Sequence, residues 1–219
     1  MEIQYLGHSA FALRLDSGRR LVIDPFLTGN PLAASQPGDL LDADLILLTH
    51  DHDDHLGDSF AMCKESGATL VAIFETAMDA QAQGITVEPM SIGGAIELDG
   101  LVIHMVNAQH GAGKGHAAGF VLEADGRNLY FAGDTGLFGD MKLFGELWDL
   151  DLAVLPIGDR FTMGPAHAAR AVDMLRAKHV IPCHYATFPI IEPDASRFVE
   201  LAGDLAEVHA LAPGERLEL

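Results

Sequence analysis

The sequence predicts an α+β fold in which two mixed β-sheets pack face to face and helices cover their outer faces, an αββα sandwich. Two observations predict it. Each half of the chain is rich in short apolar runs of strand length, separated by turn residues. Only a few segments have helical periodicity, and they are interleaved with the strand runs. Because apolar sheet faces must be covered, two packed sheets with helices outside fit this pattern.

The individual elements follow from local patterns and turn signals. The expected strands are 10–15, 20–23, 45–49 and 69–73 in the first half, and 101–106, 119–123, 128–132, 152–155 and 180–183 in the second. The expected helices are 59–65, 166–177 and 195–208. No linker-like segment interrupts the chain, so we expect a single domain over residues 1–219.

Composition limits the classes of partner. Of 219 residues, 49% are hydrophobic, and 32 acidic against 13 basic residues give a net charge of −19. A large core is expected, with apolar surface left over for a homo-oligomer contact. Such an acidic surface repels phosphate groups, so we expect no nucleic-acid and no membrane partner. Residues 1–5 carry no signal segment, and Cys63 and Cys183 lack CxxC spacing, so the cytoplasm is the expected location.

The segment 50–55, with the sequence HDHDDH, follows an apolar run of strand length and is the strongest functional signal. In an extended chain, residues two apart point the same way, so His50 and His52 can bind one metal ion together. A turn after them would direct Asp54 and His55 toward a second ion. Imidazole and carboxylate ligands suit Zn, Mn or Fe, and the lack of thiolates argues against a closed structural zinc site. The alternative interpretation is a solvated acidic loop with incidental histidines.

Three later strands also end close to a potential metal ligand, as ligand sites in sheet proteins gather at strand ends. Glycines on both sides of Asp134 would allow its backbone to approach an ion closely. The three residues are His110 after 101–106, Asp134 after 129–132, and His184 after 180–183.

Together, HxHxDH, His110, the Gly-Asp-Thr segment around Asp134, and His184 resemble the metallo-β-lactamase superfamily. The segments GHSAF at 7–11 and DPF at 24–26 resemble one branch of it. That branch contains small metal-dependent hydrolases related to ascorbate-6-phosphate lactonase and, more distantly, to N-acyl-phosphatidylethanolamine phospholipase D. Matching segments extend from residue 5 to about residue 189. The branch usually has Ser after the third histidine, where this chain has Gly111, so a hydroxyl near the substrate is missing here.

The resemblance implies two divalent ions per chain. Zn and Mn are favoured, and Fe and Ni are the alternatives that such ligands allow. By position, His50, His52 and His110 would bind one ion, Asp54, His55 and His184 the other, and Asp134 would bridge them.

A site of this kind predicts hydrolysis by a hydroxide bound to both ions. Two ions, the carboxylates of Asp54 and Asp134, and one hydroxide sum to about +1, which favours a small anionic substrate. Metal binding lowers the pKa of water to about 7, so no Ser or Cys nucleophile is needed. Asp134 would hold the hydroxide, and Asp54 or a metal-bound water would move the proton. The expected substrate contains a lactone, thioester or phosphodiester bond.

The remaining candidates carry weaker signals. His8 is expected either near the site or as a core histidine bonded to backbone. Asp24 would either orient a ligand histidine or form the turn before Pro25. Asp159 follows the strand 152–155 in a segment that resembles the branch and is expected close to the site. Arg160 and Lys114 would either contact a substrate anion or be solvated surface residues. His104 and His116 are rivals of His110 as the third histidine ligand, and His167, His179 and His209 are interpreted as surface or packing residues.

Two other classes of function stay open. Similar ligands can hold iron for redox chemistry with oxygen or nitric oxide, although no flavin-binding segment accompanies them here. A non-catalytic metal- or ligand-binding protein is the second alternative, and candidates for all seven ligands count against it.

Overall fold

In the computed structural model, which describes residues 1–219, the first β-sheet has seven strands in the order β14-β1-β2-β3-β4-β5-β6. Neighbouring strands are antiparallel from β14 to β3 and parallel from β3 to β6, so the sheet is mixed. Its strands are β1 (Glu2–Gly7), β2 (Ala10–Arg14), β3 (Arg20–Ile23), β4 (Leu45–Leu47), β5 (Thr69–Ile73), β6 (Val87–Met90) and β14 (Arg216–Glu218).

The second sheet repeats this plan with the strand order β13-β12-β11-β10-β9-β8-β7. It is antiparallel from β7 to β10 and parallel from β10 to β13. Its strands are β7 (Ala95–Leu98), β8 (Leu101–Asn107), β9 (Ala118–Ala124), β10 (Arg127–Phe131), β11 (Leu152–Pro156), β12 (His179–Cys183) and β13 (Glu207–Val208).

Both faces of each sheet are covered, which explains why the strands are continuously apolar rather than alternating. In β3, Leu21 and Ile23 enter the core between the sheets, while Val22 packs on the helix side. Across the sandwich, the rings of Phe11 in β2 and Phe131 in β10 lie 5.8 Å apart. The two sheets therefore share one apolar core.

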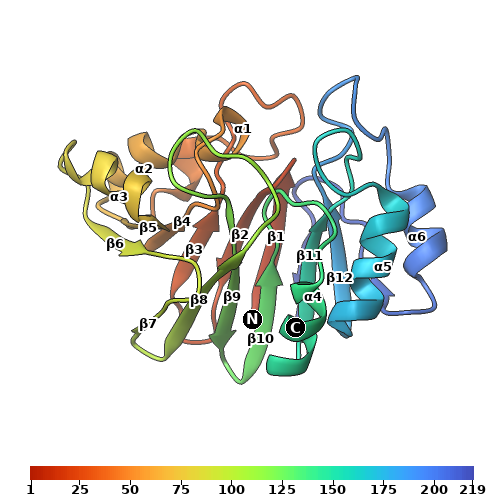
Figure 1. The fold of residues 1–219 in the computed structure, drawn as a ribbon. Helices are drawn as coiled ribbons and strands as arrows, with labels where there is room; N and C mark the ends of the chain where they lie inside the picture. The colour runs from red at the N-terminus through yellow and green to blue at the C-terminus, as the bar shows by residue number, and fades with distance from the viewer.

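Helices form the outer layers (Figure 1). The first sheet is covered by α2 (Ser59–Ser66) and α3 (Phe74–Gln81), and the second by α4 (Asp140–Leu147), α5 (Pro165–Leu175) and α6 (Ser196–Ala202). Two short elements, the 3-10 helix η1 (Pro37–Leu40) and α1 (Asp53–Leu56), lie in loops. No helix combines the length and apolar character needed to cross a membrane. The predicted fold class, two mixed sheets packed face to face with helices outside, is confirmed.

Several boundaries differ from those predicted. The helix expected over 195–208 ends at Ala202, because the chain turns at Gly203 and Glu207–Val208 pairs with β12 as the edge strand β13. The helices α3 and α4 are additional, and both begin without a side-chain cap that would mark them in the sequence.

Gly57 fixes the position of the motif segment 50–55 against the turn that follows β3. It has φ of +40°, and a Cβ atom there would overlap the Pro25 carbonyl oxygen and the Phe26 backbone. The next residue continues the contact, because Asp58 N donates to the Pro25 oxygen at 2.9 Å. The Asp58 carboxylate in turn accepts hydrogen bonds from the backbone of residues 27 and 28. The two segments that flank the site are thus locked together.

We expect Gly57→Ala to lower the free energy of unfolding by roughly 2–4 kcal/mol, from backbone strain and overlap together. Gly67→Ala is the matched control, because Gly67 has φ of +80° but open space around its Cα. Its cost should be only about 1 kcal/mol. Urea unfolding of both variants measures the difference. Equal losses would show that the close approach at Gly57 contributes nothing.

Candidate metal centre

Six strands run in the same direction and end at one edge of the sandwich, where the loops at the top of Figure 1 meet. Three belong to each sheet, and each is followed by a histidine or an aspartate. The six residues are His8 after β1, Asp24 after β3, His50 after β4, His110 after β8, Asp134 after β10 and His184 after β12.

The first group of donors consists of His50, His52 and His110, whose candidate ligand atoms lie within 4.8 Å of one another. His50 presents Nε2 and His52 presents Nδ1, and these two atoms are 3.0 Å apart. His110 is the third member of this group, whereas the two other candidates for the third histidine, His104 and His116, lie elsewhere. His104 bonds instead to Glu123 on the sheet surface, and His116 is exposed.

The second group contains Asp54, His55 and His184 and includes His8, a fourth residue. Asp54 and His55 come from α1, His184 follows β12, and His8 reaches over from the turn between β1 and β2. His8 Nε2 lies 3.2 Å from Asp54 Oδ2, and the rings of His8 and His184 are 4.1 Å apart. The side chains of His8, His55 and His184 are almost completely buried.

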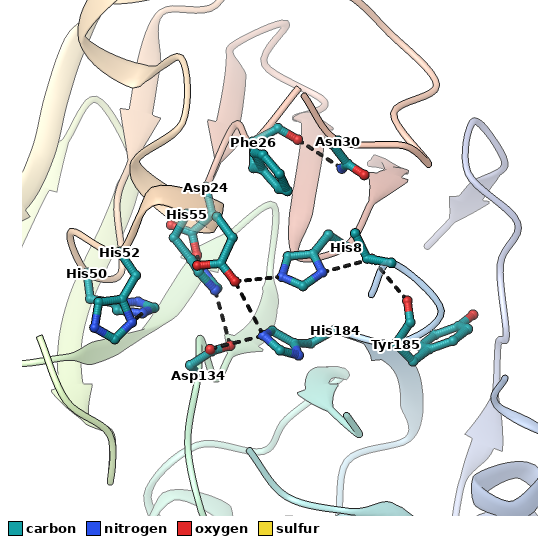
Figure 2. Close-up of polar contacts among 12 residues, drawn as sticks. His8, Asp24, Phe26, Asn30, His50, His52, His55, Asp134, His184 and Tyr185 are labelled. Carbon is teal, nitrogen blue, oxygen red and sulfur yellow. Dashed lines mark hydrogen bonds and ion pairs between the residues drawn. The ribbon is translucent and has the colours of Figure 1, made fainter. Parts of the chain in front are cut away.

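Asp134 lies between the two groups. Its Oδ2 is 3.1 Å from His184 Nε2 and 3.6 Å from His110 Nε2, and its Oδ1 is 3.2 Å from His55 Nε2. Figure 2 shows the side chains of His55, Asp134 and His184 converging from different segments. One carboxylate therefore reaches donors of both groups.

Asp24 orients two of the histidines. It accepts hydrogen bonds from the Thr49 backbone N–H at 2.8 Å, the Thr49 hydroxyl at 2.6 Å and His55 Nδ1 at 2.7 Å. Because the Thr49 hydroxyl donates to Asp24, it accepts from His50 Nδ1 at 3.1 Å. Both imidazoles thus carry hydrogen on Nδ1 and turn the lone pair of Nε2 toward the centre.

Two buried atoms that face each other test whether these residues fit metal ions. His55 Nε2 and Asp134 Oδ1 make no hydrogen bond, although both are buried and only 3.2 Å apart. With Nδ1 of His55 donating to Asp24, a neutral imidazole turns the lone pair of Nε2 toward the carboxylate oxygen, and a positive charge beside the two atoms, from a metal ion or a proton, satisfies both. The donor set of imidazoles and carboxylates without thiolates fits Zn, Mn, Fe or Ni.

The electrostatics of the centre place neutral imidazoles beside buried carboxylates that attract positive charge. Burial lowers the pKa of His50 to about 2 and the pKa of His8 to about 4, so both imidazoles are neutral. Burial alone would raise the pKa of Asp134, but His55 and His184 hold it well below its usual range. For His55, burial acts to lower the pKa, yet Asp134 and Asp24 raise it well above its ordinary value. The two carboxylates therefore demand positive charge at this point.

Backbone strain is concentrated in the same place. His8, Asp24 and His184 have φ of +58°, +46° and +57°, in the left-handed region that residues other than Gly rarely adopt. Such conformations persist where surrounding contacts hold them, and they gather at functional sites. Here, the His8 carbonyl accepts hydrogen bonds from His184 N at 2.8 Å and from the Tyr5 hydroxyl at 3.1 Å.

Other predicted site residues lie outside both donor groups. Asp159 and Arg160 are exposed on the loop after β11, the Asp159 carboxylate lies beside Gly164, and the Arg160 guanidinium lies 5.9 Å from the centroid of the Phe161 ring. Lys114 is paired with Asp79.

Three residues that support the centre have roles that the motif alone does not reveal. Asp51 is part of HDHDDH, yet its Oδ1 accepts from Gly113 N at 2.7 Å and so ties down the loop between β8 and β9. Thr49 could be suspected from its position before His50. Thr187 could not, because it bonds His8 Nδ1 at 2.9 Å across 179 residues of sequence.

Comparison with known proteins agrees with this geometry. The sequence profile of the Beta-lactamase superfamily domain matches residues 19–185. The UPF0173 metal-dependent hydrolase of Methanopyrus kandleri is 49% identical over 231 residues, covering 100% of both chains. That of Thermus thermophilus is 49% identical over 226 residues, covering 100% of this chain and 99% of the relative.

A solved structure is similar over the same length. Igni18, described as a novel metallo hydrolase from the archaeon Ignicoccus hospitalis, superposes with a TM-score of 0.94 at 38% identity, covering 100% of this chain and 98% of Igni18. The superfamily resemblance inferred from the sequence is confirmed. The chain therefore belongs to the UPF0173 metal-dependent hydrolases of the metallo-β-lactamase superfamily.

Proposed function

We propose that this hydrolase holds two divalent ions and cleaves an ester-type bond, a lactone, thioester or phosphodiester, in a small substrate. The observation that carries the proposal is the position of Asp134, whose Oδ2 lies within 3.6 Å of one imidazole nitrogen from each donor group. A single carboxylate within reach of two groups of ligands suits a site with two metal ions close together. When bound, the ions supply an ionised water near neutral pH and polarise the carbonyl or phosphoryl oxygen.

Two carboxylates of the chain would hold the ions in position and transfer the proton. Asp134 is buried and fixes the spacing between the two groups. Asp54 is the more open carboxylate, with 28% of its side chain exposed, so it can accept a proton from water and pass it to the leaving group. We propose these two as the catalytic carboxylates.

His8 positions Asp54. A carboxylate can only accept, so His8 Nε2 carries the hydrogen toward Asp54 Oδ2. Its Nδ1 lies 2.9 Å from the Thr187 hydroxyl, which also reaches the Tyr185 carbonyl oxygen at 3.1 Å. Phe26 and Phe188 close over the same imidazole, with ring centroids 5.8 and 5.4 Å from it. His8 is thus held on every side and acts on the reaction through Asp54.

The surroundings of the centre bear on the substrate. Phe26 and Phe188 are partly exposed and stacked at 6.5 Å, so an apolar part of the substrate can lie beside Asp54. Counting Asp24, which is buried against His55, lowers the formal charge of the centre from about +1 to about 0. Binding of an anionic group of the substrate would then depend on Arg160, which has no acidic partner. The loop that carries Arg160 is joined to the segment after Asp134 by the hydrogen bond from Met163 N to the Thr135 oxygen.

The direct test measures metal content and hydrolysis of lactone, thioester and phosphodiester substrates with and without chelator. We expect about two Zn or Mn ions per chain, activity that chelator removes and metal restores, and losses of roughly 100-fold or more in His52→Ala and Asp134→Ala. His104→Ala, outside the centre, should retain activity. Bound iron without hydrolysis would favour redox chemistry. Inactivity after adding Zn, Mn and Fe would favour a binding protein.

Asp24→Asn should weaken metal binding about 10- to 100-fold, because the carboxylate that fixes His55 Nδ1 is lost. A competition titration with a coloured chelator measures this affinity. Glu123→Gln is the control, since it removes the carboxylate partner of His104 at the surface. The interpretation of Asp24 fails if both variants keep wild-type affinity.

Two substitutions of His8 separate its two hydrogen bonds. Gln places an amide N–H near the position of Nε2 and can still hold Asp54, whereas Asn reaches only the position of Nδ1. We expect metal affinity in His8→Asn to fall about 10- to 100-fold, with a lower kcat and a nearly unchanged KM, and His8→Gln to recover most of both. Equal behaviour of the two folded variants would contradict the role of His8 in positioning Asp54.

A further inference from the structure

A separate cluster of potential metal ligands lies at the opposite end of the second sheet from the centre. It consists of His179, Glu207 and His209, whose donor atoms all lie within 4.8 Å of one another. His179 is the first residue of β12, whereas His184 follows the last residue of the same strand. Five residues of extended strand separate the two by roughly 16 Å, so the cluster is independent of the hydrolytic centre.

Strand pairing brings these three side chains to one face. β12 and β13 are parallel, with His179 opposite Glu207 and Val180 opposite Val208. Val180 and Val208 pack toward the helices α5 and α6, so their neighbours point the other way. His209 lies two residues after Glu207 and is held by a hydrogen bond from its N–H to the Val180 oxygen at 2.8 Å. The backbone thus fixes all three positions.

The donor atoms lie within a few tenths of an ångström of the separations around a shared ion. His179 Nδ1 and His209 Nε2 are 3.0 Å apart, and the two oxygens of Glu207 lie 3.5 Å from the first and 3.7 Å from the second. Ligand atoms about 2.0–2.2 Å from a tetrahedral ion lie roughly 3.3–3.6 Å from one another. One ion therefore fits after the two imidazoles, now at hydrogen-bond distance, move apart by a few tenths of an ångström, with no change of the backbone.

Charge around the cluster supports the same conclusion. Glu207 makes contacts with the two imidazoles and with no lysine or arginine. The adjacent Lys178 is turned to Asp149 and Asp151 instead. The carboxylate therefore has no cation from the protein, while two imidazole nitrogens point at the same space.

We propose that His179, Glu207 and His209 bind one additional transition-metal ion of the zinc class. Two imidazoles and one carboxylate favour Zn, Ni or Cu over Mg or Ca. The side chains are 29%, 67% and 16% exposed, so the ion can enter from solvent and keep water at its remaining positions. The ion would tie the two-residue edge strand β13 to β12 and so fasten the chain where it leaves the second sheet for β14.

The test is a titration of the full-length protein, with its centre occupied as purified, using Zn²⁺ alone. Bound zinc after equilibrium dialysis and the melting temperature are both measured. We expect the wild type to bind one zinc per chain more than His209→Gln or His179→Gln, and added zinc to raise the Tm of the wild type by a few degrees but not that of these two variants. His167→Gln, an exposed histidine on α5, is the matched control and should behave like the wild type.

The proposal is overturned if the cluster variants bind as much zinc as the wild type, or if zinc raises their Tm equally. Hydrolysis is a separate readout, and His209→Gln should leave it unchanged because the cluster is remote from the centre. Conversely, loss of hydrolysis in Asp134→Ala should leave the additional zinc in place. The two metal sites can therefore fail independently.

Discussion

One imidazole, that of His55, lies between two buried carboxylates, and the arrangement of the whole centre depends on this alignment. Its Nδ1 donates to Asp24 at 2.7 Å, and its Nε2 faces Asp134 at 3.2 Å. Both carboxylates are at most 3% exposed. Ionised groups in so dry an environment need compensating positive charge nearby. Divalent ions beside Asp134 would provide it and leave Asp24 to fix the orientation of His55.

The sandwich provides this alignment by ending six strands of two sheets at one edge. The sheets are joined there directly, since the His8 carbonyl after β1 accepts from His184 N after β12. Both residues have left-handed backbone conformations, which cost about 1–3 kcal/mol each and require surrounding contacts to hold them. The large shared core can support that cost, and the result is a rigid set of donors from segments far apart in sequence.

The fold class, and the gathering of the seven predicted ligand residues at one edge of the sandwich, could be predicted from the sequence because each depends on a local pattern. An apolar run of strand length followed by His or Asp predicts both a buried strand and a candidate metal ligand at its end. Contacts between distant segments leave no such pattern, so the pairing of His8 with Thr187 could not be predicted. The same holds for β13, whose two residues show no periodicity, and His209 was therefore interpreted as a surface or packing residue near a helix.

Loops show where sequence reasoning reaches its limit. Asp51 lies within the motif but serves the loop at Gly113, because side chains of adjacent residues point in different directions. Arg160 was a candidate for contact with a substrate anion because of its charge. Its position on an exposed loop depends on long-range contacts such as that of Met163 N with Thr135 O. These contacts follow from the packed tertiary structure rather than from any short segment.

The most direct measurement of the two-metal arrangement is anomalous X-ray diffraction from crystals of the manganese-loaded protein. Two anomalous peaks are expected, about 3.5–4 Å apart, one beside His50 and His52 and the other beside His55 and His184, with Asp134 between them. A single peak, or two peaks that Asp134 does not bridge, would contradict the account.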